Sequence, residues 1–200
     1  MTDPVEIRWI KIGIGAGVCA SALYPALLFA PLPLRATAAL GAFLGPAIGI
    51  GSLGLYRVLQ IHARSVSSAL GAIHNVFAGA LFTAMVLVQL AVRQNASPRP
   101  EGIVGVWLGL DVAWDIYIGL GTIFFGYAML HHPRFRWPFA VSGLALGLLV
   151  IVLNLLPFPL PPAEAGSVDV GPLVGLWYLA ATIQAWRSLT WARQSLRPAA

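Results

Sequence analysis

The stretch IVGVWLGLDVAWDIYIGLGTIFFGYAML, from Ile103 to Leu130, decides how the rest of this chain must fold. It exceeds the roughly 20 apolar residues that a helix needs to cross the hydrocarbon core of a bilayer. Asp111 and Asp115 are its only charged residues. A helix with apolar side chains on all faces has no stable place in water, so the stretch predicts a transmembrane helix.

The composition of the whole chain agrees with a bilayer environment. Of its 200 residues, 58% are hydrophobic and 10% are charged, whereas a typical soluble domain carries about 25% charged residues. Too few polar side chains remain to cover the surface of a water-soluble fold. The length suits one bundle with short loops, so we expect a single transmembrane domain over residues 1–200.

Other apolar segments flank this stretch, and short polar or proline-containing loops separate them. Each is long enough to cross a bilayer as a helix. The expected fold is therefore an all-α, polytopic integral membrane bundle of about six transmembrane helices. The predicted spans are residues 9–30, 36–59, 68–90, 103–130, 138–156 and 173–191.

The positions of the basic residues predict the orientation of the bundle. With these spans, nine of the 12 Lys and Arg residues fall on the side that holds both termini, which places the N- and C-termini in the cytoplasm. The basic residues occur singly or in pairs, so the net charge of +5 indicates contact with anionic lipid and not with nucleic acid. The richness in Arg, Ala, Gly and Pro is typical of a GC-rich bacterial genome, and we expect the inner membrane.

Polar side chains inside the predicted spans mark the place where function is expected. An ionisable group in a bilayer costs a few kcal/mol or more, so it is a functional candidate by default. At 1.5 Å of rise per residue, Asp115 lies roughly 18 Å from the outer boundary, with Asp111 one turn further out. The candidate ligand- or proton-binding residues are Asp111, Asp115, His74, Asn75, Gln184 and Asn154.

Counting residues from the span ends predicts which of these side chains share a depth. His74 lies at roughly 20 Å and Gln184 at roughly 17 Å from a boundary. We therefore expect Asp115, His74 and Gln184 to form one layer near the midplane, with Asn154 closer to the outer face. A carboxylate beside a histidine at this depth suits a proton relay, a cation site or an acid–base pair.

Three classes of function stay open at this point. The chain could bind or transport a proton, a cation or a small amphipathic solute. It could be a membrane-embedded enzyme that acts on a lipid or isoprenoid, with Asp115 and His74 as acid and base. It could be a structural or accessory subunit of a larger complex, in which the polar residues tie helices together. The sequence does not decide whether the chain is an enzyme.

The sequence predicts no resident cofactor and no metal site. Cys19 is the only cysteine, which excludes thiolate clusters. The adjacent pair His131 and His132 lacks the spacing of a helix-borne zinc motif. A haem held by two histidines would need His74 to face His62, His131 or His132 across the bundle.

Glycines recur four residues apart on five of the predicted spans. Because lipid tails are as apolar as leucine, helices in a bilayer associate through close backbone approach. We expect these faces to pack the bundle or to bind a second copy or a partner subunit. The sets are Gly13/Gly17, Gly41/Gly45/Gly49, Gly105/Gly109, Gly143/Gly147 and Gly171/Gly175.

Overall fold

The computed structural model describes residues 4–95, 101–158 and 169–196, and these residues form seven α-helices and no β-strand. Five of the described helices are long and apolar enough to cross a membrane, judged by length and composition. The helices are α1 (Pro4–Phe29), α2 (Leu34–His62), α3 (Val66–Asn95), α4 (Glu101–Met129), α5 (Arg136–Leu155), α6 (Gly171–Arg187) and α7 (Leu189–Ser195).

The sixth predicted span differs from the observed structure. The sequence predicts one helix over residues 173–191, whereas α6 ends at Arg187 and α7 begins at Leu189. Between them lies Ser188, fully buried, whose hydroxyl donates to the carbonyl of Gln184 at 2.7 Å. The 17 residues of α6 extend only about 25 Å, less than the ~30 Å hydrocarbon core. The sixth crossing therefore stays a prediction.

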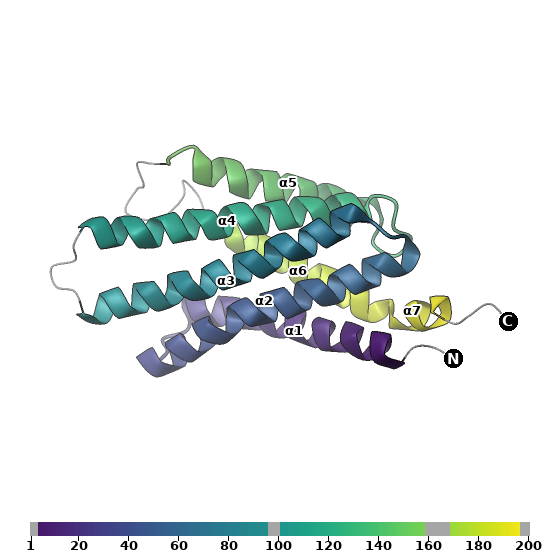
Figure 1. Cartoon of the computed structure of the whole chain (residues 1–200), viewed down its shortest axis with the longest axis horizontal. Helices are drawn as coiled ribbons and strands as arrows, with labels where there is room; N and C mark the ends of the chain where they lie inside the picture. The colour runs from purple at the N-terminus through teal and green to yellow at the C-terminus, as the bar shows by residue number, and fades with distance from the viewer. Residues whose placement is uncertain (1–3, 96–100, 159–168, 197–200) are drawn as a thin grey trace.

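Successive helices from α1 to α6 run in opposite directions, and each packs against the next from α1 to α5. The helix α6 packs against α1 and α5 and closes the bundle. Both chain ends lie at one end of the bundle (Figure 1), called here the terminal end; the opposite end is the distal end. Of the basic residues used to predict orientation, Arg99 and Arg197 lie outside the described residues. The side of the membrane that the terminal end faces stays a prediction.

Glycines bring neighbouring backbones together along the whole series from α1 to α5, as expected for helices in lipid. Gly13, Gly17, Gly45, Gly143 and Gly147 belong to the predicted sets and do make such close approaches. The pairs are Gly13 with Gly54 and Gly17 with Gly51 (α1–α2), Gly45 with Gly79 (α2–α3), Gly71 with Gly121 (α3–α4), and Gly119 with Gly147 and Gly126 with Gly143 (α4–α5).

One predicted glycine face is not used inside the chain. A Cβ added at Gly105 or Gly109 would meet no atom within 4 Å. Both glycines lie near the distal end of α4, and Gly105 is exposed. Contact of this face with a second copy or a partner subunit stays a prediction.

Candidate functional site

Two cavities lie inside the bundle, next to the helix that closes it. The distal cavity, of about 240 Å³, is lined by the distal parts of α1, α3, α4 and α5 and by the start of α6. The central chamber, of about 70 Å³, lies between α1, α2, α3, α4 and α6. Tyr24, Trp114 and Gly171 line both, so the two spaces meet at these residues.

Three carboxylates line the distal cavity. Asp111 and Asp115 are half-buried and lie one turn apart on α4, so both point to the same side of that helix. Asp169 is exposed just before α6, and its Oδ1 accepts a hydrogen bond from the backbone N–H of Gly171 at 2.8 Å. No Lys, Arg or His belongs to the described lining. Three of the seven acidic residues of the chain thus surround one cavity.

Asn154 of α5 presents a buried amide to the same cavity. The side chain is only 4% exposed, and its Nδ2 donates to the Val150 carbonyl at 3.0 Å. The amide also interacts with the carboxyl of Asp115. Its Oδ1 has no hydrogen-bond partner among the described residues. A buried acceptor left unpaired costs about 1–3 kcal/mol, so a ligand that donates a hydrogen bond here would be stabilised.

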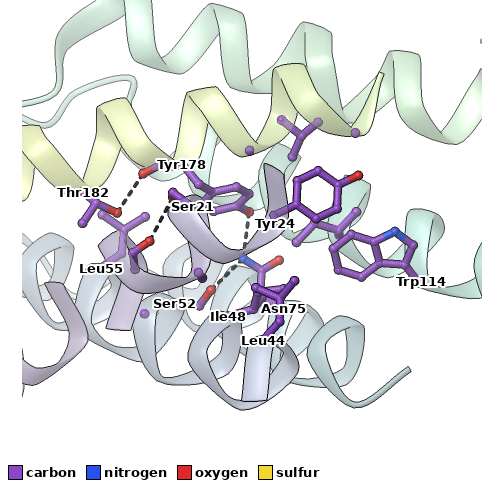
Figure 2. A pocket seen from close by; sticks show the side chains of 17 residues that line it. Ser21, Tyr24, Leu44, Ile48, Ser52, Leu55, Asn75, Trp114, Tyr178 and Thr182 are labelled. Atoms are coloured by element: carbon purple, nitrogen blue, oxygen red, sulfur yellow. Dashed lines mark hydrogen bonds between the residues drawn. The ribbon is translucent and has the colours of Figure 1, made fainter. Parts of the chain in front are cut away.

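An aromatic cluster stands where the two spaces meet. The ring of Phe82 contacts the rings of Trp114 and Tyr24 edge-on, with centroids 4.9 Å and 6.2 Å apart. Figure 2 shows Tyr24 and Trp114 at one end of the central chamber, with Leu55 and Thr182 at the other. Tyr24 and Trp114 therefore stand between the distal cavity and the central chamber.

The central chamber has apolar walls, and one polar cluster joins four helices beside it. Asn75 of α3, which is fully buried, donates from Nδ2 to the hydroxyls of Ser52 (α2, 2.8 Å) and Tyr178 (α6, 2.7 Å) (Figure 2). The hydroxyl of Thr122 (α4) lies 3.0 Å from that of Tyr178. The Oδ1 of Asn75 faces the backbone of Gly121, where an added Cβ would collide with it. These bonds tie helices together, as buried polar groups do in membranes.

The structure separates the six predicted site residues into three groups. Asp111, Asp115 and Asn154 come together at the distal cavity, while Asn75 belongs to the polar cluster. His74 lines neither cavity, although α3 and α4 are neighbours. Its Nδ1 lies 2.7 Å from the Leu70 carbonyl, and its ring packs on Tyr117 and Phe124.

Gln184 lines neither cavity. Its Nε2 donates to the Arg134 carbonyl at 2.6 Å, in the connection between α4 and α5 at the terminal end. It occupies the final turn of α6, whose last residue is Arg187, and its depth in a membrane stays a prediction. Its hydrogen bond holds α6 to that connection.

The remaining histidines gather at the terminal end. His132 is 3% exposed, its ring contacts that of His62 at 5.4 Å, and its Nδ1 accepts the backbone N–H of Arg134 at 3.2 Å. Burial lowers the pKa of His132 to about 4, and the neighbouring charges of His62 and Arg134 add to this effect. His132 is therefore neutral at pH 7, while His131 is exposed. Among the described residues, no three His, Cys, Asp or Glu side chains form a group that could hold a metal ion.

Sequence reasoning missed several residues of the two cavities. Gln89 lies inside a predicted span and lines the distal cavity, and the rule that singled out Gln184 would have found it. Tyr24 and Tyr178 carry hydroxyls in the middle of apolar segments, which is a weaker signal of the same kind. Asp169 follows a proline-rich loop, and nothing in the sequence predicted that it would line the same cavity as Asp111.

The described helices are those of a multi-pass helical membrane protein, with an acidic cavity inside the bundle. Comparison with family models, curated proteins and solved structures finds no match for this chain.

Proposed function

We propose that this chain binds or transports a proton, a cation or a small amphipathic solute through the distal cavity. In this proposal the chain lies in the inner membrane of a bacterium, with the terminal end in the cytoplasm and the distal cavity on the outer side. One observation carries the proposal: Asp111 and Asp115, both inside a membrane-spanning helix, face a cavity of about 240 Å³ that no described basic side chain lines.

The distribution of polar contacts supports binding over a purely structural role. Residues that tie helices together donate hydrogen bonds to other helices or connections, as the amide nitrogens of Asn75 and Gln184 do. The Oδ1 of Asn75, like that of Asn154, has no partner among the described residues, but Asp111 and Asp115 lie in a different space from Asn75. The aspartates instead share their space with the unpaired oxygen of Asn154. Carboxylates kept only as links between helices would be expected to point at donors across an interface and not into a cavity.

The enzyme alternative has less support from the geometry. It needs Asp115 and His74 to act on one substrate as acid and base. The described contacts of His74 are the Leu70 carbonyl and two aromatic rings, and it lines neither cavity. The carboxyl of Asp115 interacts with Asn154 of α5 instead.

The test is ligand-dependent stability of the detergent-purified protein. A probe that binds only the folded state raises the unfolding midpoint. At a probe concentration of 100 times its Kd, the free energy of unfolding increases by about 2.7 kcal/mol. We expect a panel of Na⁺, K⁺, protons (as pH) and small charged solutes to contain a probe that stabilises the wild type and fails to stabilise Asp115→Asn. The matched control is Glu6→Gln, because Glu6 pairs with Arg57 at 3.6 Å, away from the cavity, near the terminal end.

Either result is informative about the site. Loss of stabilisation in Asp115→Asn, with Glu6→Gln unchanged, supports the cavity as the binding site. If every response of the wild type survives in both Asp111→Asn and Asp115→Asn, the proposal fails and the accessory-subunit alternative takes its place.

A further inference from the structure

We propose that the ligand of this site is a small organic cation, an alkylammonium whose charged head lies at Asp111 and Asp115 and whose apolar part extends past Trp114 into the central chamber. This inference rests on the proposed function and narrows it to one chemical class. Four features of the two cavities support it: their charge, their hydrogen-bonding groups, their aromatic faces and their division into a polar and an apolar space.

The charge of the distal cavity selects a cation. Its described lining holds Asp111, Asp115 and Asp169 and no basic residue, within a chain whose formal net charge is +5. An ionised carboxylate in a low-dielectric site needs a partner of opposite charge. Since the described lining supplies no such partner, either a proton or a cationic ligand neutralises the carboxylates, and an anion would be repelled.

The hydrogen-bonding groups of the cavity match an ammonium. The oxygen Oδ1 of Asn154 is an acceptor without a partner, and the side chain is 4% exposed. Asp111 and Asp115 add carboxylate oxygens one helical turn apart. An alkylammonium offers three N–H donors and no acceptor. Such a head group can donate to both kinds of oxygen and leaves no acceptor of its own unpaired.

Aromatic faces lie directly beside the acidic groups. Trp114 precedes Asp115 in α4 and lines both the distal cavity and the central chamber. Tyr24 of α1 also lines both. Cations are attracted to the faces of Trp and Tyr rings, and the attraction grows when water is excluded. An organic cation bound at the carboxylates would therefore have Trp114 and Tyr24 between its charged head and the central chamber.

The central chamber sets the size of the apolar part. Its walls include Leu44, Ile48 and Leu55, and its volume is about 70 Å³. That space is about half of the ~150 Å³ cavity that can hold a benzene ring, enough for a short alkyl segment but not for a long lipid chain. Much of the distal cavity is also apolar, including Leu28, Met85 and Val150. Among the described residues, no three acidic or histidine side chains form a group that could hold a metal ion, so a bare divalent ion fits this lining less well than an organic cation.

The experiment compares n-alkylamines from methylamine to hexylamine with the n-alcohols of equal length. All amines are protonated at pH 7.5, because an alkylammonium has a pKa near that of lysine, about 10.4. The protein is held in lipid nanodiscs, and affinities come from the shift of its unfolding midpoint with probe concentration. We expect each amine to bind at least tenfold more tightly than the alcohol of the same length, and Asp115→Asn to abolish this difference. Glu6→Gln is the matched control and should keep it.

The length of the alkyl chain of the amines tests whether their apolar part occupies the central chamber. We expect affinity to rise about fourfold per methylene, the value for full burial, and to level off near butylamine once the chamber is full. Ala20→Leu adds bulk to a buried residue of the chamber wall. We expect it to flatten the length series and to leave the amine-over-alcohol preference of the shortest probes intact.

Failure of this inference is distinguishable from failure of the proposed function. Responses to protons or Na⁺ that need Asp115, without any preference for amines over alcohols, would overturn the organic cation and keep the site. No Asp115-dependent response to any probe would overturn both. Should Asp115→Asn not fold, Asp111→Asn and Ala20→Leu provide the same comparisons, and an unchanged amine preference and length series in both would reject the inference.

Discussion

Replacing Gly13 by alanine should weaken the contact between α1 and α2 more than any other change in α1 of equal size. A Cβ added at Gly13 would lie 2.8 Å from the backbone N of Gly54 and 3.2 Å from the carbonyl oxygen of Ile50. Ordinary van der Waals contact begins at 3.4 Å, so the helices must separate by at least about 0.6 Å, from 2.8 to 3.4 Å. Backbone atoms cannot rotate away as a flexible side chain can, and the whole seam has to open.

The size of the effect follows from two opposing contributions. Overpacking a well-packed interface costs about 1–3 kcal/mol, while alanine in place of glycine favours a helix by about 0.5–1 kcal/mol. We therefore expect a net loss of about 1–2 kcal/mol for Gly13→Ala. Gly15, two residues further on, has no atom within 4 Å of an added Cβ, so Gly15→Ala should keep only the helix-propensity gain.

The assay is thermal unfolding of both variants in the same detergent, followed by intrinsic tryptophan fluorescence. The two variants should therefore differ by about 1.5–3 kcal/mol, which corresponds to about 3–12 °C at about 2–4 °C per kcal/mol for a chain of this size. Gly54→Ala, which meets the same contact from α2, should behave like Gly13→Ala. The reasoning is refuted if Gly13→Ala unfolds at or above the midpoint of Gly15→Ala.

Three further predictions concern residues outside the cavities or beside them. The pKa of His132 is about 4 in the folded protein, below its ordinary value of about 6.5. The unfolded chain therefore binds a proton at His132 at a higher pH than the folded protein does. Acidification from pH 6.5 to 4 should lower the free energy of unfolding by at most about 3 kcal/mol. Unfolding midpoints against pH measure this slope, which His132→Gln should lose and His131→Gln should keep. Gln184→Leu should lower stability by about 1–2 kcal/mol through its lost bond to Arg134 and should leave the affinity for alkylamines unchanged in the same titration. Asn75→Leu should lower the unfolding midpoint by more, since it removes two hydrogen bonds and leaves buried hydroxyls without a donor.

Hydrophobicity predicted the long helices because the bilayer leaves a chain few alternatives. Backbone groups in lipid must bond within their own helix, so an apolar run of sufficient length can only be helical. The helices α1 to α5 match five of the predicted spans and extend them by up to five residues at either end, as α3 does by continuing to Asn95. The break at Ser188 escaped prediction because it depends on local hydrogen bonds, to the carbonyl of Gln184 and from Arg134.

Counting residues from a span end predicts where a side chain lies along a helix but not which way it points around that helix. Successive residues of a helix point about 100° apart, so His74 and Asn75 share a depth but not a side. Asn75 points to the centre of the bundle, whereas His74 packs on Tyr117 and Phe124. Counting from the end of a span cannot separate these two directions. Only the packing of α3 against its neighbours fixes them.

The position of both cavities follows from how the bundle is closed. From α1 to α5 each seam contains glycines whose backbones touch, which leaves little volume between the helices. The seams of α6 contain no such pair among the described residues: Gly17 meets the side chain of Thr182, Gly143 meets Trp177, and Gly171 meets Tyr24.

Side chains hold helices further apart than touching backbones do, and they do not fill the extra space completely. Residues at the start of α6 line both the distal cavity and the central chamber, on the side of the bundle that this looser closure leaves open. The aspartates of α4 can remain in the membrane because the same seam gives them a cavity to face instead of lipid. The glycine pattern that makes α1 to α5 a tight scaffold thus also explains, by its absence at the described seams of α6, why both cavities lie beside that helix.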